Sequence, residues 1–231
     1  MKILKNLAII PARGGSKRIP KKNIKDFLGK PIIAYSIETS LKSNLFDEVV
    51  VSTDDNEIEK IAIQYGATVH KRSQKNADDF ATLSDVLVEV IHQYHNLKIE
   101  VDSVCCILPT APFIRTHHLI ESQYLFFNKN KDSLIPIVEF SYPVQRSLII
   151  SKEGTILFSN PQYTNTRSQD LEKHYHDVGQ FYWIKGKVLL KSKSLMTDNT
   201  GFYELPSFLV QDIDTEDDWR NAELKYKILH G

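Results

Sequence analysis

A basic loop near the amino terminus has the residue types for binding an anion. The apolar run 7–10 ends at Pro11, and two adjacent glycines, Gly14 and Gly15, follow among cations. Glycines at φ > 0 let backbone N–H groups come close to a phosphate, and the cations neutralise its charge. The loop is not a P-loop, because Ser-Lys rather than Lys-Ser or Lys-Thr follows Gly15, and it has no Gly-x-Gly-x-x-Gly pattern. These features predict a site for a small polyanion; its cations are Arg13, Lys17, Arg18, Lys21 and Lys22.

Two carboxylates near the carboxyl terminus form a second candidate site. Asp212 and Asp214 are separated by one residue, so in an extended segment both side chains would point to the same side. There they could share Mg²⁺, or Mn²⁺, with phosphate oxygens. The alternative is that they precede the last helix as capping acids, since Thr215 follows them. The basic loop favours the metal, because a nucleoside triphosphate brings Mg²⁺ with it.

The third candidate is the polar and aromatic segment 167–182. His174 and His176 are two residues apart and could face one way, but no third metal ligand is evident. Substrate-contacting or surface histidines are therefore favoured over a metal site. The aromatic residues in and around this segment fit either a sugar site or the core; they are Tyr142, Tyr163, Phe181 and Trp183.

Strands and helices alternate along most of the chain, which predicts an α/β, Rossmann-like, mostly parallel sheet flanked by helices. In such sheets ligands bind at the carboxyl ends of strands, so the basic loop, Asp54 and residues 109–115 should share one rim. Asp54, together with Glu57, is expected to cap the second helix, and Pro31 to occupy the first position of the first helix. Strands are expected at 7–10, 47–52, 68–70, 103–108, 133–138, 180–184 and 208–211, with helices at 32–43, 54–65, 83–95, 116–127, from 186, and 215–229.

The segment 139–178 breaks this rhythm within an otherwise single domain, 1–231. It is rich in Tyr, Pro, Asn, Ser and Gln and lacks helical periodicity, which predicts a small β-rich insertion. Such an insertion buries little by itself, so it is expected to pack on another subunit.

Composition narrows the class of protein. The 231 residues include 42% apolar residues, enough for a sizeable core, and 29 cations balance 29 anions. The balance argues against nucleic acid or a membrane surface as partner. Cys105 and Cys106 are adjacent in an apolar run and are expected in the core. With no apparent signal peptide or membrane span, a cytoplasmic location is expected.

Four motifs resemble those of the CMP-sialic acid synthetase family. Residues 9–23, IIPARGGSKRIPKKN, are similar to its signature loop, roughly I-P-A-R-x-G-S-K-x-x-x-x-K-N. Residues 51–54 (VSTD), 108–112 (LPTAP) and 212–215 (DIDT) resemble its further motifs in the same order over nearly the whole chain. Residues 77–82 and 176–183 resemble the branch that activates pseudaminic acid. Leu108 replaces the glutamine of the family's Q-P-T-S-P motif, which suits a deoxy sugar ending in a methyl group.

The resemblance implies a fold of the nucleotide-diphospho-sugar transferase type and the reaction of CTP with a nine-carbon nonulosonic acid to give a CMP-sugar and pyrophosphate. It implies a homodimer whose insertion reaches the partner's site, and a product used in a bacterial surface or flagellar glycan. Asn23 would read cytosine, with help from Arg72, and no side chain is an evident general base. The positions that match the family's motifs imply catalytic roles for Arg13, Lys22 and Asp214, and metal binding by Asp212 and Asp214. They imply that CTP is bound by Ala12, Arg13, Gly14, Gly15, Ser16, Lys17, Asn23, Arg72 and Thr82. They imply that the sugar is bound by Leu108, Thr110, Arg167, His176 and Gln180.

Three alternatives stay open at this point. The sugar could instead be sialic, legionaminic or ketodeoxyoctonic acid. The Asp-Ile-Asp motif at 212–214 also fits the D-x-D metal motif of glycosyltransferases, although such enzymes need fewer cations after the first strand. A non-catalytic module that binds CTP would show the same loop but release no pyrophosphate.

Overall fold

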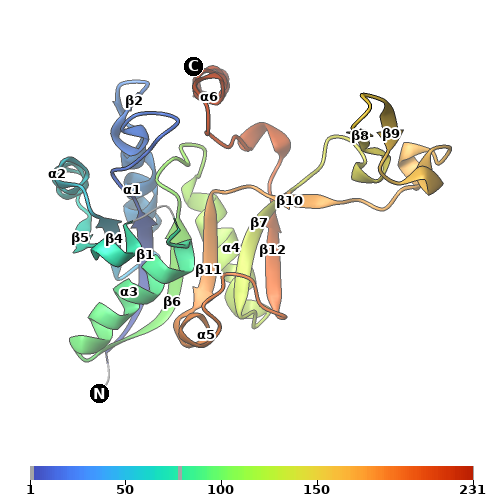
Figure 1. Cartoon of the computed structure of the whole chain (residues 1–231). Coiled ribbons are helices and arrows are strands. Elements are labelled where there is room, and N and C mark those ends of the chain that lie inside the picture. The colour runs from blue at the N-terminus through green and yellow to red at the C-terminus, as the bar shows by residue number, and fades with distance from the viewer. Residues whose placement is uncertain (1–2, 78–79, 231) are drawn as a thin grey trace.

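One mixed, mostly parallel sheet of eight strands forms the centre of the computed structural model, which describes residues 3–77 and 80–230 (Figure 1). Its strands are β1 (Ile3–Pro11), β4 (Glu48–Thr53), β5 (Thr68–Lys71), β6 (Ile99–Ile107), β7 (Ser133–Glu139), β10 (Tyr175–Asp177), β11 (Phe181–Lys185) and β12 (Thr200–Glu204). The order is β10-β7-β11-β6-β1-β4-β5, with β12 beside β7. The four strands β6, β1, β4 and β5 are parallel to one another, whereas β11 runs antiparallel to β6 and β7. The predicted α/β class is confirmed.

Helices cover both faces of the sheet and divide the core in two. One face packs α1 (Ile32–Ser43), α2 (Asn56–Gln64) and α4 (Thr116–Asn128), and the other packs α3 (Leu83–Asn96) and α5 (Gly186–Ser192). Successive residues of β1 serve opposite cores: Ile9 lies in one and Ile10 in the other, both fully buried. This explains the unbroken apolar run, since a strand covered on both faces need not alternate. Cys105 and Cys106 divide between the cores in the same way, and burial raises the pKa of both thiols.

A third, smaller core places the carboxyl-terminal helix over the opening loop. Helix α6 (Glu216–His230) packs Trp219 against the short hairpin of β2 (Asp26–Phe27) and β3 (Lys30–Pro31). Ile213, which is 1% exposed, lies in this cluster, so the segment before α6 is anchored between its two aspartates. The loop after β1 and residues 212–214 are thereby brought together, although about 190 positions separate them in the chain.

Several local predictions are wrong. The expected strand at 208–211 begins with a 3₁₀ turn, η6 (Ser207–Leu209), and the eighth strand is instead β12. Helix α2 is capped by Asp55, whose carboxylate accepts from the N–H groups of Glu57 and Ile58, so Asp54 is released from that role. Helix α1 begins at Ile32, which makes Pro31 its N-cap. Strand β6 begins four residues earlier than expected.

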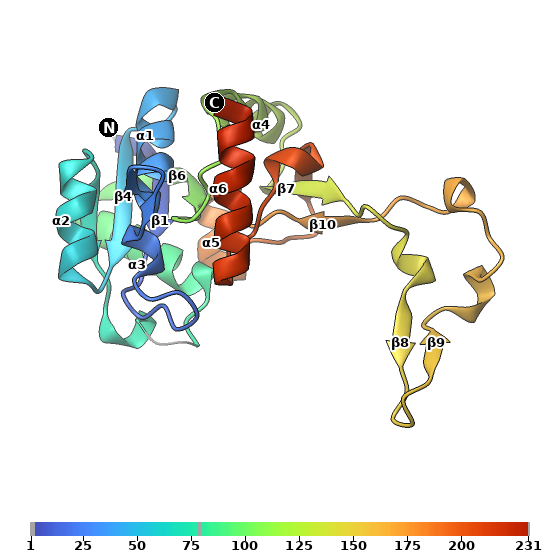
Figure 2. The same cartoon turned by 90° about the horizontal axis from the view of Figure 1, so that it is seen from above.

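The insertion forms an arm that projects from the β7–β10 end of the sheet (Figures 1 and 2). Apart from β10, which joins the main sheet, its β content is a hairpin of β8 (Leu148–Ile150) and β9 (Ile156–Phe158), with 3₁₀ turns such as η3 (Val144–Arg146) before it and η5 (Ser168–Asp170) after it. The arm is therefore less regular than the β-rich insertion predicted. Within the described part of the chain, no helix is long and apolar enough to cross a membrane.

Candidate active site

The basic loop after β1 forms one wall of a cavity of about 380 Å³ at the carboxyl end of the parallel strands. The other wall comes from the turn after β6, so the predicted common rim exists. The cavity combines cations with hydroxyl and amide groups, which is the chemistry of a phosphate site. Its lining residues are Pro11, Arg13, Ser16, Lys17, Arg18, Lys22, Asn23, Leu108, Pro109 and Thr110.

Position 14 requires a glycine because Asp55 lies very close to it, and not because the backbone there has a positive φ. Neither Gly14 nor Gly15 has a positive φ, so that expectation is wrong. A Cβ at Gly14 would lie 2.9 Å from the Cβ of Asp55, the residue that caps α2. The N–H of Gly14 donates to Asp54 Oδ1 at 3.0 Å. The end of β4 therefore holds the first half of the loop in place.

Lys22 and Arg18 converge on the second candidate site. Lys22 Nζ donates to the carbonyl of Ile213 at 2.6 Å and lies 3.4 Å from Asp214 Oδ1. Arg18 Nη2 donates to the same oxygen at 2.8 Å. These partly exposed pairs are weak in water, so a triphosphate can draw the cations away at small cost. The structure thus brings together the predicted catalytic residues Lys22 and Asp214, with Arg13 lining the same cavity.

Asp212 and Asp214 flank the anchored Ile213 and remain accessible. Asp214 pairs with cations of the first cavity, whereas Asp212 lines a second cavity. Among the described residues, no group of three His, Cys, Asp or Glu side chains could hold a metal. Two carboxylates nevertheless fit Mg²⁺, which keeps several waters and takes its remaining oxygens from substrate phosphates. Which aspartate would contact the ion stays a prediction.

The second cavity, of about 590 Å³, lies beside the first, and Leu108 lines both. It mixes apolar and acidic groups, in contrast to the basic first cavity. On one side Tyr182 donates its hydroxyl to Asp177 Oδ2 at 2.7 Å, and Asp177 Oδ1 accepts from the N–H of Gly179. The remaining lining residues include Val138, His176, Val178, Val210 and Asp212.

Arg72 lies next to Asp54 and near Arg13, but it does not line the first cavity. Its Nη2 donates to the carbonyl of Ser52 at 2.7 Å, and both Arg72 and Asp54 line a third, smaller cavity. Burial lowers the pKa of Arg72, and the Asp54 carboxylate opposes that shift. The guanidinium is therefore held rigidly at the rim rather than free in solvent.

Comparison with known proteins identifies the class of enzyme to which this site belongs. The family model described as Cytidylyltransferase matches residues 7–212, which include the basic loop, Leu108 and Asp212. The chain belongs to the cytidylyltransferase family. It is therefore a CTP-dependent nucleotidyltransferase.

Similar proteins within and around this family cover nearly the whole chain. A pseudaminic acid cytidylyltransferase of Campylobacter jejuni (strain 81-176) is 41% identical over 228 residues, covering 98% of both chains. N-acylneuraminate cytidylyltransferase A of Danio rerio is 37% identical over 94% of this chain and 49% of its own length. The solved structure of CMP:2-keto-3-deoxy-manno-octonic acid synthetase complexed with CTP aligns with a TM-score of 0.72 at 21% identity, covering 97% and 99% of the two chains. That last likeness bears on the fold alone.

Several residues of this cytidylyltransferase that were predicted to bind CTP also form hydrogen bonds within the protein. Asn23 lines the first cavity, and its Nδ2 donates to the carbonyl of Arg13, so it braces the loop as well as facing the cavity. Ala12 is fully buried, and its N–H extends the β1 ladder to Ser52. Thr82 forms a reciprocal capping box with Asp85 at the start of α3. Asp78 and Asp79, in the motif at 77–82, lie outside the described residues.

Two predicted sugar contacts lie away from both cavities within this chain. Arg167 is on the arm, where it forms an ion pair with Asp170 at 2.7 Å. Gln180 is 2% exposed, and its Nε2 donates to the carbonyl of Leu209 at 2.9 Å. Its backbone carbonyl accepts from the N–H of Leu108, so it joins the start of β11 to the wall between the cavities. His176, by contrast, lines the second cavity as expected, with its ring on Phe140.

Some lining residues were missed from the sequence. Tyr182, Asp177 and Val210 line the second cavity, but were not among the predicted contacts. Tyr182 and Asp177 lie in the segment 176–183 that resembles the pseudaminic branch, so that segment contained the signal. Val210 comes from a stretch predicted to be a strand, and nothing in its local pattern indicates a cavity.

Proposed function

We propose that this cytidylyltransferase joins CTP to pseudaminic acid, giving CMP-pseudaminic acid and pyrophosphate. The observation that carries this proposal is the place of Leu108, at the boundary between the basic cavity and the second cavity. An apolar side chain there, with Val178 and Val210 nearby in the same lining, suits a methyl group better than a hydroxylated tail. The identity to the Campylobacter protein supports the same substrate.

The proposed chemistry is an in-line displacement. The anomeric hydroxyl oxygen of the sugar forms a bond to the α-phosphorus of CTP as the bond to the bridging oxygen breaks. Pyrophosphate leaves, and the hydroxyl proton passes to solvent. Arg13, Lys17 and Lys22 would neutralise charge on the triphosphate and leaving group, and hold it in line with the sugar. Asn23 and Arg72 would contact the cytosine.

Mg²⁺, or Mn²⁺, is the proposed metal. Bound to phosphate oxygens, it would lower the pKa of the attacking hydroxyl and stabilise charge on the phosphates. Asp212, which lines the second cavity, and Asp214, which pairs with Lys22 of the first cavity, would hold it at the boundary of the two cavities.

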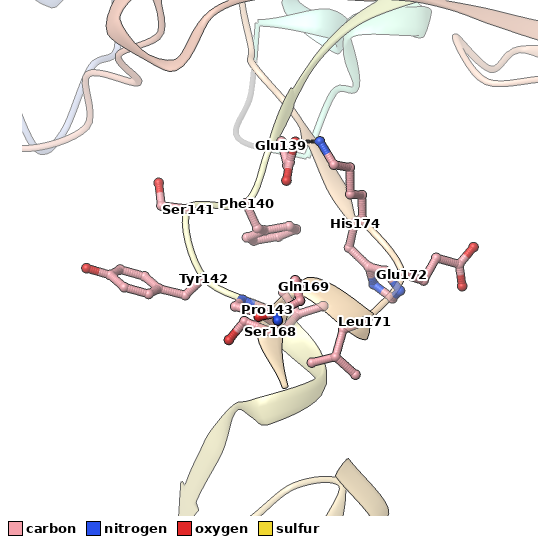
Figure 3. A pocket seen from close by; sticks show the side chains of 12 residues that line it. Glu139, Phe140, Ser141, Tyr142, Pro143, Ser168, Gln169, Leu171, Glu172 and His174 are labelled. Atoms are coloured by element: carbon pink, nitrogen blue, oxygen red, sulfur yellow. Dashed lines mark hydrogen bonds and ion pairs between the residues drawn. The ribbon is translucent and has the colours of Figure 1, made fainter. Parts of the chain in front are cut away.

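We propose further that the protein is a homodimer, with each arm covering the partner's second cavity. Figure 3 shows the residues that line a cavity of about 330 Å³ at the root of the arm, where Lys173 Nζ lies 2.8 Å from Glu139 Oε2. Beyond it, adjacent residues of β8 expose apolar side chains on both faces of the hairpin: Ile149 is 51% exposed and Ile150 is 78% exposed. A two-stranded hairpin is not stable by itself in water, so a second surface is expected to cover it. Arg167 would then reach the partner's sugar.

The reaction belongs in the cytoplasm in this proposal, because CTP is made and consumed there. The CMP-sugar would donate its sugar to a bacterial surface or flagellar glycan.

Pyrophosphate release from CTP and Mg²⁺ with a panel of nonulosonic acids tests the proposal. Pseudaminic acid should give the highest kcat/KM, with sialic and legionaminic acids well below it. Release with sialic acid but not with pseudaminic acid would overturn the substrate. CTP binding without release from any acid would leave a non-catalytic module instead. Omission of the divalent metal should abolish release, and addition of Mn²⁺ should restore it.

A further inference from the structure

A chain of polar contacts extends inward from Arg72, the residue next to Asp54 and near Arg13 of the basic loop. It begins at Arg72, whose Nε donates to Ser52 Oγ at 3.4 Å. Ser52 Oγ lies 3.1 Å from His70 Nδ1, and His70 Nε2 faces Glu89 Oε1 at 3.9 Å. Ser52 is fully buried and His70 is 5% exposed. The four residues come from β4, the end of β5 and α3, so the chain of contacts joins three elements.

The direction of one of these hydrogen bonds follows from the groups themselves. Arg72 can only donate, so Ser52 Oγ accepts from it and has its own proton left to donate. When that proton goes to His70 Nδ1, the imidazole proton lies on Nε2, facing the Glu89 carboxylate; in the other neutral tautomer Nδ1 donates to Ser52 Oγ, so both tautomers keep the contact. Burial lowers the pKa of His70 and favours the neutral imidazole, although Glu89 opposes the shift. Each member therefore fixes the orientation of the next.

Glu89 also braces the segment that follows Arg72. Its Oε1 accepts from the N–H of Ser73 at 2.8 Å, and its Oε2 accepts from the amide of Asn76 at 2.5 Å. The turn after β5 is thus tied to α3 by the same carboxylate that faces His70. The arrangement is not a hydrolytic triad, because the Ser52 hydroxyl is sealed from solvent and is used by Arg72.

We propose that His70, acting through Ser52, is a positioning residue that holds Arg72 in the orientation needed to bind the nucleotide. The inference rests on the proposed role of Arg72 at the CTP base. It predicts that loss of the imidazole weakens CTP binding and CTP selectivity without removing any group that touches the reacting atoms. Glu89 supports the same array from α3.

CTP and UTP affinities measured by titration calorimetry, together with KM and kcat, test this role. His70→Leu removes the hydrogen-bond partner of Ser52 and should raise the Kd and KM for CTP about tenfold, while kcat stays within about threefold. The affinity ratio of CTP to UTP should fall. His70→Asn places an amide oxygen near the position of Nδ1 and should restore most of the affinity. His95→Leu, on the exposed face of α3, is the matched control and should behave as wild type.

A double variant distinguishes a positioning effect of His70 on Arg72 from a general loss of folding stability. If His70 acts through Arg72, His70→Leu should add little to the loss caused by Arg72→Met, because the group it orients is already gone. Additive losses, or wild-type CTP affinity in a folded His70→Leu protein, would overturn the inference. Binding of CTP is measured without the sugar, so a wild type that binds CTP but releases no pyrophosphate would overturn the proposed function alone.

Discussion

The basic loop after β1 and the arm are both irregular segments, yet the chain supports them very differently. The loop is tied to the body at several points: Gly14 to Asp54, Lys21 to Glu57, and Lys22 to the carbonyl of Ile213. The arm has one short hairpin and exposes its largest apolar side chains, Ile150 among them, at 78%. Figure 2 shows the contrast, with α6 lying across the body and the arm extending away from it.

This difference in support indicates which of the two segments a single chain holds in place by itself. The loop is held by acids and carbonyls from the same chain. The arm has an apolar surface that its own body does not cover. We therefore expect substitutions in the loop to change chemistry with little effect on assembly, and substitutions in the arm to change assembly first.

Loss of the Lys22 ammonium should give the largest effect. Lys22→Ala removes a cation beside Asp214 in the triphosphate cavity, so kcat should fall about a hundredfold, which corresponds to roughly 2.7 kcal/mol of transition-state stabilisation. Thermal unfolding should change little by comparison. Lys60→Ala, an exposed lysine of α2, is the matched control. A kcat within about threefold of wild type, or 0.7 kcal/mol, would remove Lys22 from the catalytic residues.

The arm should respond in its assembly. Ile150→Asp places a charge on the exposed apolar face of β8 and should weaken dimer association by at least about thirtyfold, the effect expected for an interface anchor. Sedimentation equilibrium measures this directly. The body should keep its melting temperature at concentrations where the wild type is monomeric. Ile63→Asp, an equally hydrophobic and 59% exposed residue of α2, should leave association unchanged. A wild type that sediments as a monomer at all concentrations would refute the proposed dimer.

Leu108 tests the boundary between the two cavities with a smaller effect. Leu108→Gln should lower the preference for pseudaminic over sialic acid about tenfold, measured as the ratio of kcat/KM values. Its melting temperature should stay near that of wild type, because the side chain lines a cavity. Ile107→Gln, one residue earlier and 1% exposed, should instead destabilise the fold strongly. Equal losses of stability at both positions would make Leu108 a core residue.

The smallest effect concerns the pH dependence of stability in the body. Burial lowers the pKa of His118 to about 4, and its Nδ1 accepts the N–H of Arg115. The unfolded chain takes up this proton near pH 6.5, so the free energy of unfolding should fall as the pH drops from 6.5 towards 4. Urea unfolding of His118→Gln should show a shallower fall, whereas His92→Gln, at an exposed position of α3 that does not contribute to the shift of His118, should keep the wild-type slope. Identical slopes in all three proteins would exclude this contribution.

The regular body was largely predictable because its signals are local. The unbroken apolar run of β1 indicates a strand covered on both faces, and adjacent Cys105 and Cys106 were correctly expected in the core. The cap of the last helix, where Thr215 and Asp218 bond reciprocally, was also visible in the sequence. The predictions that failed concern which of two adjacent residues caps a helix and which segment pairs with a given strand. Asp55 caps α2 rather than Asp54, and β12 pairs with β7 through contacts about 70 residues apart.

The candidate site was predictable in its residue types but not in its layout. The motifs indicated which cations and carboxylates to join, since their chemistry is set by residue type and spacing. They gave no indication that Gln180 is buried on the carbonyl of Leu209, or that Arg167 lies on the arm. Those outcomes depend on the path of the chain between elements, which no local pattern encodes.

By itself the sequence determined the α/β class, the concentration of positive charge in the loop after β1 and the separate nature of segment 139–178. Apolar periodicity, local charge and turn residues act over a few positions, so each can be recognised without knowledge of the fold. Tertiary structure alone decided that Ile213 is buried, with Asp212 lining the second cavity and Asp214 paired with cations of the first, and that Leu108 lines both cavities. It also placed His70 and Ser52 beneath Arg72. Each of these depends on packing between elements far apart in the chain, where burial and the need to satisfy polar groups select one arrangement.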